Sequence, residues 1–375
     1  MKKVKLDNYV DILSGFAFKS SQFNDNKRGL PIVRIRNVKP AFSETYYDGE
    51  FNEKFLLNNG DILIGMDGEF NCEKWQGGKA LLNQRVCRIK SISDFLDDQY
   101  LFYYLSPVLK IIEGKSNFVT VKHLSVKQIQ EIKIPLPPIA SQRRIADILD
   151  KADEIIRKRK EAIALTEQLQ KSIFLDMFGD PVINPKGWEV EELNNVISII
   201  SGQVDPKVEP FIDMPHIGGE NLQSNTNNIQ NIKTPRELKL KSGKYLFQSG
   251  NVLYSKIRPY LNQVVITDFS GVCSADIYPL RVIETKIKND FLIYLLRSKF
   301  FLDYAQKHST RTNIPKINRP TLLSFRFPCP PINIQKDFSD KCNKITQIQK
   351  NFNQYLTESE NLFNSLLQKA FKGEL

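Results

Sequence analysis

The sequence predicts an α+β protein with a pseudo-twofold internal repeat. Two mixed, β-rich domains are separated by two long repeat helices that form an antiparallel coiled coil. Three observations indicate this fold. The chain has 375 residues, which is too long for one ordinary hydrophobic core. A long stretch of it occurs twice, and each occurrence is an amphipathic helical run of roughly 40 residues.

The repeat is clearest where two stretches, each beginning with proline, align without a gap. "PLPPIASQRRIADILDKAD" begins at Pro135 and "PCPPINIQKDFSDKCNKIT" begins at Pro328, so equivalent residues lie 193 positions apart. The same offset places Gln142 over Gln335. Upstream, "LDNYVDILSG" matches "LNNVISIISG", and "GDIL" matches "GNVL". We therefore expect four segments: a first module at 1–135, a central repeat helix at 136–179, a second module at 180–328 and a C-terminal repeat helix at 329–375.

The modules read as β-rich with a few shorter helices. Short apolar runs such as "PIVRIRNV", "DILIGM", "NVLYS" and "IYPLRV" are bounded by Gly, Asn, Asp and Pro, which is typical of strands between turns. Helical periodicity is expected in "DQYLFYYLSPVLKII" and in "NDFLIYLLRSKFFLDYAQ".

In the two long helical runs, mostly apolar residues recur at steps of three and four. This is the heptad pattern of helices that pack on one another. An antiparallel pair of this length extends roughly 60 Å. The alternative is that each helix packs only on its own module. The predicted helix-pair seam consists of Ile145, Ile148, Ala152, Ile155, Leu169 and Ile173 in the first helix, and of Phe338, Ile345, Ile348, Phe352, Tyr355, Leu362 and Leu366 in the second.

Composition favours a polyanionic partner. The formal net charge is +11 and the pI is about 9.2, although a merely basic, well-solvated surface would give the same numbers. There is no run of 18 apolar residues and no apolar core after "MKKVKLDNYV", so we expect no membrane span, no secretory signal and a cytoplasmic location. The five cysteines are widely spaced and never form C-x-x-C, which indicates reduced structural thiols.

Catalytic patterns are absent from the sequence. His123, His216 and His308 lack metal-ligand spacing, and no glycine-rich cofactor loop follows a strand. The acidic run "DGEFNCEK" could suggest a nuclease, but a loop that accepts hydrogen bonds from cytosine amino groups explains it equally well. We therefore predict a chain that binds rather than catalyses, with no catalytic residue, no metal and no cofactor.

Polar, basic and aromatic loops suit the reading of duplex DNA, because Arg, Lys, Asn and Gln can make paired hydrogen bonds to guanine or adenine edges. For any one loop the alternative is an ordinary solvated turn. In the first module the candidate DNA-binding residues are Lys19, Ser20, Arg34, Arg36, Asn37, Asp67, Glu69, Asn71, Lys79, Gln84 and Arg85. In the second module they are Gln203, Lys207, His216, Glu220, Asn221, Tyr254, Ser255, Lys256, Arg258, Tyr260, Asn262, Gln263 and Arg311.

Taken together, these stretches resemble the specificity subunits of type I restriction-modification systems over essentially the whole chain. The resemblance is carried by "LPPIASQRRIADILDKAD" followed by "LQKSIFLDMFGDP", and by "GFAFKSSQF", "GMDGEF", "LNQRV" and "GNVLYSKIRPYLN". It implies two target-recognition domains, each reading one half of an asymmetric bipartite site in double-stranded DNA. It also implies that the helices dock two methyltransferase subunits, which bind S-adenosylmethionine and modify adenine, and that motor-nuclease subunits join for restriction.

The second helix departs from this pattern. The basic pair Arg143 and Arg144 of the first copy is replaced by Lys336 and Asp337. Two rival interpretations remain open: a nuclease or methyltransferase fused to recognition domains, using the acidic loop near Asp67, and a coiled-coil scaffold that does not bind DNA.

Overall fold

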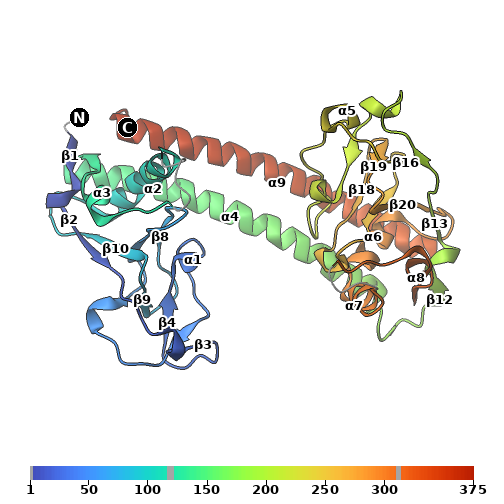
Figure 1. Ribbon diagram of the computed structural model, residues 1–375, viewed down its shortest axis with the longest axis horizontal. Helices are drawn as coiled ribbons and strands as arrows, with labels where there is room; N and C mark the ends of the chain where they lie inside the picture. The colour runs from blue at the N-terminus through green and yellow to red at the C-terminus, as the bar shows by residue number, and fades with distance from the viewer. Residues whose placement is uncertain (1–2, 116–121, 310–313) are drawn as a thin grey trace. The chain divides into compact units, whose positions relative to one another are not determined.

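The computed structural model describes residues 3–115, 122–309 and 314–375 (Figure 1). The chain divides into two compact units, and the division falls inside both long helices. Unit 1 contains residues 1–160 together with 354–375, and unit 2 contains residues 161–353. Each unit therefore combines one β-rich module with the beginning of one long helix and the end of the other. This arrangement confirms the predicted fold class.

The described part of the first module contains two larger sheets, one two-stranded pair and three α-helices. Strands β2, β10, β7 and β8 form one sheet in that order, and β3, β5, β4, β9 and β6 form the other. Strands β1 and β11 pair separately. The bounds are β1 Lys3–Lys5, β2 Val10–Ser14, β3 Phe23–Asn24, β4 Leu30–Val33, α1 Ile35–Val38, β5 Tyr46–Tyr47, β6 Leu56–Leu57, β7 Ile62–Gly65, β8 Cys72–Lys74, β9 Ala80–Leu82, β10 Val86–Ser91, α2 Asp98–Lys115, α3 Val126–Gln130 and β11 Lys133–Pro135.

The second module repeats the four-stranded sheet of the first. Strands β13, β20, β17 and β18 form it, β14, β16, β19 and β15 form a second sheet, and β12 pairs with β21. The bounds are β12 Val190–Glu192, β13 Ile197–Ile199, β14 Gln203–Val204, β15 His216–Ile217, α5 Pro235–Leu238, β16 Lys244–Phe247, β17 Val252–Ser255, β18 Val264–Ile266, β19 Gly271–Cys273, β20 Ile277–Val282, α6 Asn289–Arg297, α7 Lys299–Lys307, α8 Arg319–Leu323 and β21 Arg326–Pro328.

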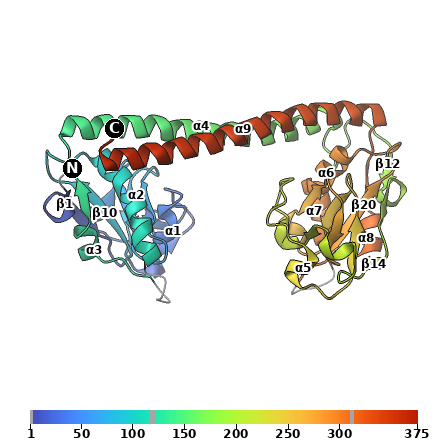
Figure 2. The ribbon, with the colours of Figure 1, turned by 90° about the horizontal axis from the view of Figure 1, so that it is seen from above.

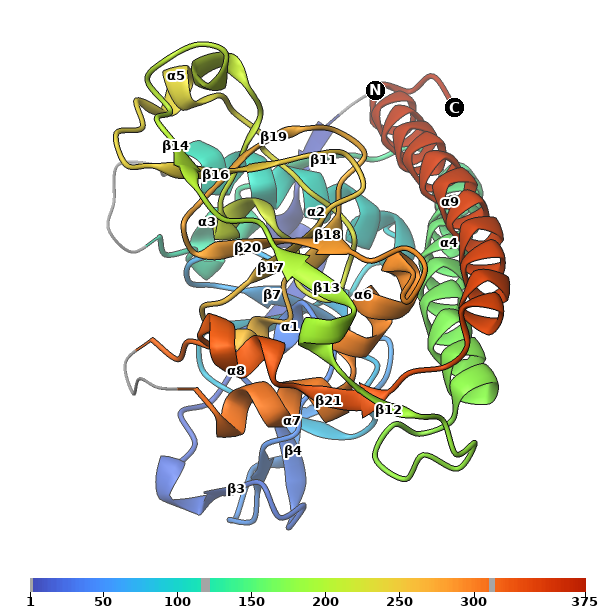
Figure 3. The same ribbon diagram turned by 90° about the vertical axis from the view of Figure 1, so that its right-hand side faces the viewer.

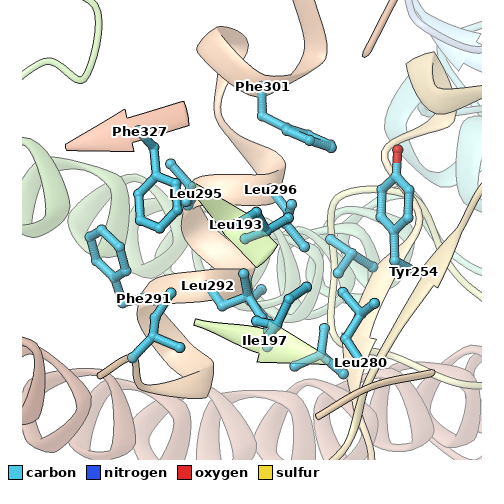
Figure 4. Close-up of a cluster of buried hydrophobic side chains, with 14 of the residues drawn as sticks. Leu193, Ile197, Tyr254, Leu280, Phe291, Leu292, Leu295, Leu296, Phe301 and Phe327 are labelled. Carbon is cyan, nitrogen blue, oxygen red and sulfur yellow. The ribbon is translucent and has the colours of Figure 1, made fainter. Parts of the chain in front are cut away.

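One strand of the four-stranded sheet in each module, β7 or β17, is buried at every position because both of its faces are covered. In β7, Ile62 and Ile64 enter one hydrophobic core while Leu63 enters a second. In β17, Tyr254 and Leu253 divide in the same way between two cores (Figure 4). Successive side chains of a strand point to opposite faces, so a strand covered on both sides needs a continuous apolar run.

The run "NDFLIYLLRSKFFLDYAQ" forms two helices rather than one. Ser298 adopts an extended backbone between α6 and α7, and its hydroxyl accepts a hydrogen bond from the N–H of Phe301 at 3.3 Å. Serine at such a position caps the new helix and satisfies one of its free N–H groups. Figure 4 shows α6 directing Leu292, Leu295 and Leu296 into the core against β13 and β17.

The long helices are α4, Ile139–Phe178, and α9, Ile332–Lys372. In unit 1 they run antiparallel: the guanidinium of Arg159 lies 5.2 Å from the ring of Tyr355, whereas nearer the start of α4 Tyr103 bonds Asp150 at 2.6 Å and contacts the ring of Phe363. Earlier residues of α4 therefore lie beside later residues of α9, as in an antiparallel pair.

In unit 2 the end of α4 and the beginning of α9 lie side by side (Figure 3). The rings of Phe174 and Phe178 lie 5.7 and 5.1 Å from the ring of Phe338. All three side chains are buried in the same core as Phe291 of α6. The helices are thus part of the core of this unit.

The structure corrects alternate positions of the predicted seam. In α4, Ile155 is 47% exposed and Leu169 is 49% exposed, whereas Leu149 is fully buried and Ile156 nearly so. The buried stripe therefore steps by four and then three residues from Ile145, so that it faces the module as well as the other helix. The same one-residue shift occurs in α9, where the exposed positions are Ile348, Tyr355 and Leu362, although the Tyr355 ring still contacts Arg159 of α4. Ile145, Ala152, Phe338 and Ile345 are buried as the seam requires, and Ile148, Ile173, Phe352 and Leu366 are partly buried.

The repeated glutamines explain why the sequence around the helix starts is kept in both copies. Gln335 is fully buried; its side-chain oxygen accepts from the N–H of Lys288 at 2.9 Å, and its amide donates to the carbonyl oxygens of Pro330 at 2.7 Å and Lys286 at 3.2 Å. Gln142 makes the corresponding three bonds in unit 1. Each glutamine joins a long helix to its module.

Replacing Gln335 with alanine is expected to lower the free energy of unfolding by about 3 kcal/mol, because buried backbone groups lose their partners. Denaturant unfolding followed by circular dichroism measures this, with Lys336→Ala as the control on an exposed neighbour, where the expected change is within about 0.5 kcal/mol. Equal midpoints for the two variants would contradict the structural role of the glutamine.

Candidate nucleic-acid interface

In unit 1 several loops that are distant in sequence meet at one end of the four-stranded sheet of β2, β10, β7 and β8, which we call the central sheet. The N–H of Met66 donates to the carbonyl of Arg85 at 2.9 Å, and the N–H of Leu124 donates to the carbonyl of Met66 at 2.7 Å. The N–H of Gly68 donates to the carbonyl of Lys122 at 2.9 Å. We call this set of loops loop cluster 1; it comprises residues 15–17, 66–68, 84–85 and 122–124.

Loop cluster 1 lies at the end of the module remote from the long helices. The N–H of Asp97, at the start of α2, bonds Gln142 of α4. At the other end of α2, the carboxylate of Glu113 accepts from the N–H of Phe70 at 2.9 Å, beside the cluster. The 18 residues of α2 span roughly 27 Å. Figure 2 shows α2 running away from the long helices in this unit. A surface so placed is accessible to a large ligand.

Three polar side chains meet within loop cluster 1. Asp67 Oδ2 lies 3.2 Å from Arg85 Nε, and Asp67 Oδ1 lies 2.6 Å from His123 Nδ1. The carboxylate is largely covered, while the arginine and histidine side chains are exposed. Asp67 therefore holds two cationic or donor groups at the surface. Arg85 has a φ of +67°, a left-handed conformation, so the turn before β10 projects its side chain outward.

Unit 2 contains an equivalent loop cluster with the same backbone hydrogen bonds. The N–H of Lys256 donates to the carbonyl of Asp276 at 2.9 Å, that of Ile317 to the carbonyl of Lys256 at 3.0 Å, and that of Arg258 to the carbonyl of Pro315 at 2.7 Å. We call this loop cluster 2; it comprises residues 256–258, 275–276 and 315–317. It stands where loop cluster 1 stands in unit 1.

Loop cluster 2 presents a different set of side chains. Arg258 is exposed and has a φ of +47°, at the position that Gly68 occupies in unit 1. Lys256 Nζ lies 3.5 Å from the exposed carboxylate of Asp276 and also donates to the carbonyl of Ala275. Beside the cluster, the exposed ring of Tyr260 borders a hollow of about 300 Å³ next to the end of α7.

Many of the sequence-predicted DNA-binding residues are exposed. Asp67, Gln84 and Arg85 lie in loop cluster 1, and Lys256 and Arg258 lie in loop cluster 2, whereas the other candidates lie outside both clusters. The exposed ones are Lys19, Ser20, Arg36, Glu69, Lys79, Gln84, Arg85, Gln203, Lys207, Glu220, Arg258 and Tyr260. Arg34, Asn37, Asp67, Asn71 and Gln263 are partly buried, and Arg311 lies outside the described residues.

Six candidates are buried, which does not favour base contact by their side chains. They are His216, Asn221, Tyr254, Ser255, Lys256 and Asn262. Two of them bond within the module: the amide of Asn262 donates to Asn225 at 2.7 Å and to the carbonyl of Arg297, and Asn221 bonds Gly218 and two further backbone groups. Burial lowers the pKa of His216.

Sequence reasoning missed several exposed groups on these surfaces. Phe16 is about half exposed and packs against Phe18 and Phe55 beside loop cluster 1, where it could stack on a base. His123 was considered only as a metal ligand. The available signal was its position, which corresponds to Lys316 at the repeat offset of 193.

The acidic run that suggested a nuclease does not form one cluster. Asp67 belongs to loop cluster 1, whereas Glu73 lies on β8, where burial raises the pKa of its carboxyl group. Across residues 3–115, 122–309 and 314–375, no three His, Cys, Asp or Glu side chains are placed to share a metal ion. The five cysteines are unpaired, and burial raises the pKa of the Cys342 thiol to about 12. No helix in the described part of the chain is long and apolar enough to cross a membrane.

Comparison with known proteins identifies the family. The family model described as "Type I restriction modification DNA specificity domain" matches residues 1–165 and again 185–361. The EcoBI specificity subunit of a type I restriction enzyme from Escherichia coli is 28% identical over 410 residues, covering 100% of this chain and 86% of that protein.

Two solved structures share the fold. The S subunit of a type I restriction-modification system from M. genitalium has a TM-score of 0.57 at 12% identity, covering 99% of this chain and 96% of that one. A chain solved for complex assembly and conformational transition of the type I R-M system has a TM-score of 0.56 at 17% identity, covering 100% and 98%. The chain therefore belongs to the DNA specificity family of type I restriction-modification systems, as a sequence-recognising specificity subunit rather than a catalytic one.

Proposed function

We propose that each unit reads one half of an asymmetric bipartite site in double-stranded DNA, through loop cluster 1 in unit 1 and loop cluster 2 in unit 2. The observation that supports this most directly is that the two clusters share three equivalent backbone hydrogen bonds but present different side chains. A common scaffold with different surface groups suits two half-sites of similar geometry and unlike sequence.

The charge and exposure of these surfaces support a duplex ligand. The chain carries a formal charge of +11, and Arg85, His123 and Arg258 are exposed on the clusters. Guanidinium groups suit both phosphates and guanine edges. In this proposal the polar residues that stay exposed on neighbouring loops, such as Lys79 and Lys207, contribute backbone contacts that position the modules.

Binding of the purified chain to duplex DNA across a range of salt concentrations tests this function. We expect the logarithm of affinity to fall steeply with the logarithm of salt concentration, because bound phosphates release counterions. A scaffold that does not bind DNA would show no measurable binding at low salt, and that result would contradict the proposal. A single-stranded oligonucleotide of the same base composition is the control for duplex specificity.

We further propose that the helices dock two methyltransferase subunits, one on each unit, and that a motor-nuclease joins this complex for restriction. The proposal is supported by the apolar side chains that the corrected seam leaves exposed. In unit 1 these include Ile155 and Leu362, and in unit 2 they include Ile348 and Leu169. The two pairs are equivalent at the repeat offset of 193, as two copies of one partner require. Large apolar side chains exposed on a helix are typical of protein interfaces.

Replacing Ile348 and Leu169 together with glutamate is expected to reduce the bound methyltransferase from two copies to one, because it removes one of two equivalent surfaces. The mass of the assembled complex, measured by light scattering, gives the stoichiometry. Thr346→Glu, which places the same charge two residues away on an exposed position of α9, should leave two copies bound. Retention of both copies by the double variant would contradict docking at this surface.

A further inference from the structure

The two loop clusters place opposite charges at one equivalent position. Arg85 and Asp276 are each the residue before the long strand of the central sheet, β10 or β20. Each gives its carbonyl oxygen to the equivalent N–H group, that of Met66 in unit 1 and that of Lys256 in unit 2. The two residues therefore occupy equivalent backbone positions, although one carries a guanidinium and the other a carboxylate.

We propose that Arg85 and Asp276 read equivalent base pairs of the two half-sites with opposite hydrogen-bond polarity: Arg85 donates to a guanine, and Asp276 accepts from the amino group of a cytosine or an adenine. This inference rests on the proposed DNA-reading function of the loop clusters. It names the residues that make the two half-sites differ.

The geometry around Arg85 is suited to presenting a guanidinium. Asp67 engages Nε at 3.2 Å, and the same carboxylate is fixed from its other side by His123. Among the residues that the structure describes, the two terminal nitrogens of Arg85 make no hydrogen bond to side chains or backbone. Contact at Nε leaves the terminal N–H groups of the guanidinium available to a ligand. Their spacing matches the O6 and N7 acceptors of guanine. Asp67 is thus a positioning residue.

The geometry around Asp276 has the reverse polarity. Its carboxylate is about half exposed and lies 3.5 Å from the largely buried Nζ of Lys256. Lys256 is also bonded to the carbonyl of Ala275, so the lysine holds the turn and the carboxylate projects from it. A carboxylate can only accept hydrogen bonds, which favours the amino groups of cytosine and adenine over guanine O6 and N7. The base that each residue contacts would therefore differ between the half-sites.

The test uses the full chain produced with its methyltransferase subunit in a host that lacks other adenine methylation, with methylated sites mapped genome-wide. Arg85→Asn suits the left-handed backbone, which asparagine tolerates. It should lower the preference for guanine at one base pair of one half-site by about ten- to one-hundred-fold. All other positions should keep their wild-type bases. Asp276→Ala should lower the preference for cytosine or adenine at one base pair of the other half-site by a similar factor.

Two further variants keep the result decisive. Asp67→Asn should relax the same base pair as Arg85→Asn, which a merely structural role would not predict. Lys90→Ala removes an exposed cation from β10 and should leave the motif unchanged. If Arg85→Asn lowered methylation at every site without relaxing one base, Arg85 would be a phosphate contact and the inference would be wrong. An unchanged motif would overturn it as well.

Loss of a whole half-site would indicate an unfolded module, and Arg85→Lys then decides. It retains the charge but not the paired donors, so relaxation at one base pair supports the inference and a wild-type preference for guanine overturns it. The failure of this inference is separable from failure of the proposed function. If these variants were silent while exchange of a whole module still changed one half-site, only the assignment of Arg85 and Asp276 would be wrong.

Discussion

Exchanging residues 180–328 for the equivalent module of another family member is expected to replace one half of the methylated motif and to leave the other half unchanged. The reason is structural independence: loop cluster 2 is built entirely from this segment, and its hydrogen bonds join residues 256 to 317 of the same module. Loop cluster 1 makes its own bonds among residues 66 to 124. Each module should therefore carry its own half-site preference when it is exchanged as a whole.

The exchange has one structural requirement. Phe174, Phe178 and Phe338 of the long helices are buried together with Phe291 of the module, so the incoming module must offer a complementary aromatic core. Returning the original module to the same junctions is the control for the junctions themselves. Genome-wide mapping of methylated adenines provides the measurement. If both half-sites changed, the modules would not read DNA independently.

Inserting a second "ALTE" after Glu167 is expected to widen the gap between the two half-sites by one or two base pairs. Four residues lengthen a helix by roughly 6 Å, and one base-pair step is about 3.4 Å. Because four residues are close to one helical turn, the corrected seam of α4 rotates little against α9. The half-site bases should stay the same, since neither loop cluster is altered.

A matched insertion of the same four residues after Glu360, the equivalent position of α9, separates length from strain. It should change the gap in the same direction, and the two insertions together should give the best-defined new gap. Replacing the native "ALTE" with four other helix-forming residues should leave the gap unchanged. An unchanged gap in all insertion variants would show that the helix pair does not set the distance between half-sites.

The internal repeat and the fold class could be predicted from the sequence because both depend on periodicity. The repeat preserves Gln142 and Gln335, whose side chains satisfy the same buried backbone groups in each unit. The strands that both modules bury on two faces contain short apolar runs within "DILIG" and "NVLYS". Such constraints leave a pattern in one sequence.

The seam register could not be predicted in the same way. Ile155 and Ile156 are adjacent isoleucines, as apolar as each other, and only the three-dimensional position of the module decides which one is buried. The pattern supports either a three-four or a four-three step. The error is informative, because the apolar residues left outside the seam are those proposed to dock a partner.

Site residues were the least predictable part. Asn262 and Arg258 stand four residues apart in one polar loop, yet one is buried in internal hydrogen bonds and the other is exposed. Both have left-handed backbones, and side-chain chemistry alone does not distinguish a group that builds the loop from one that projects from it. The grouping of Asp67, Arg85 and His123 depends on contacts between segments far apart in sequence.

The central claim is that this chain reads two different half-sites, one with each unit, and thereby directs adenine methylation. Mapping methylated adenines in a host that produces the chain together with its methyltransferase subunits tests it most directly. We expect a single motif with two defined, unlike half-sites, a fixed gap of unspecified bases, and no methylation when the chain is omitted. A continuous or palindromic motif, or methylation that does not require the chain, would contradict the claim.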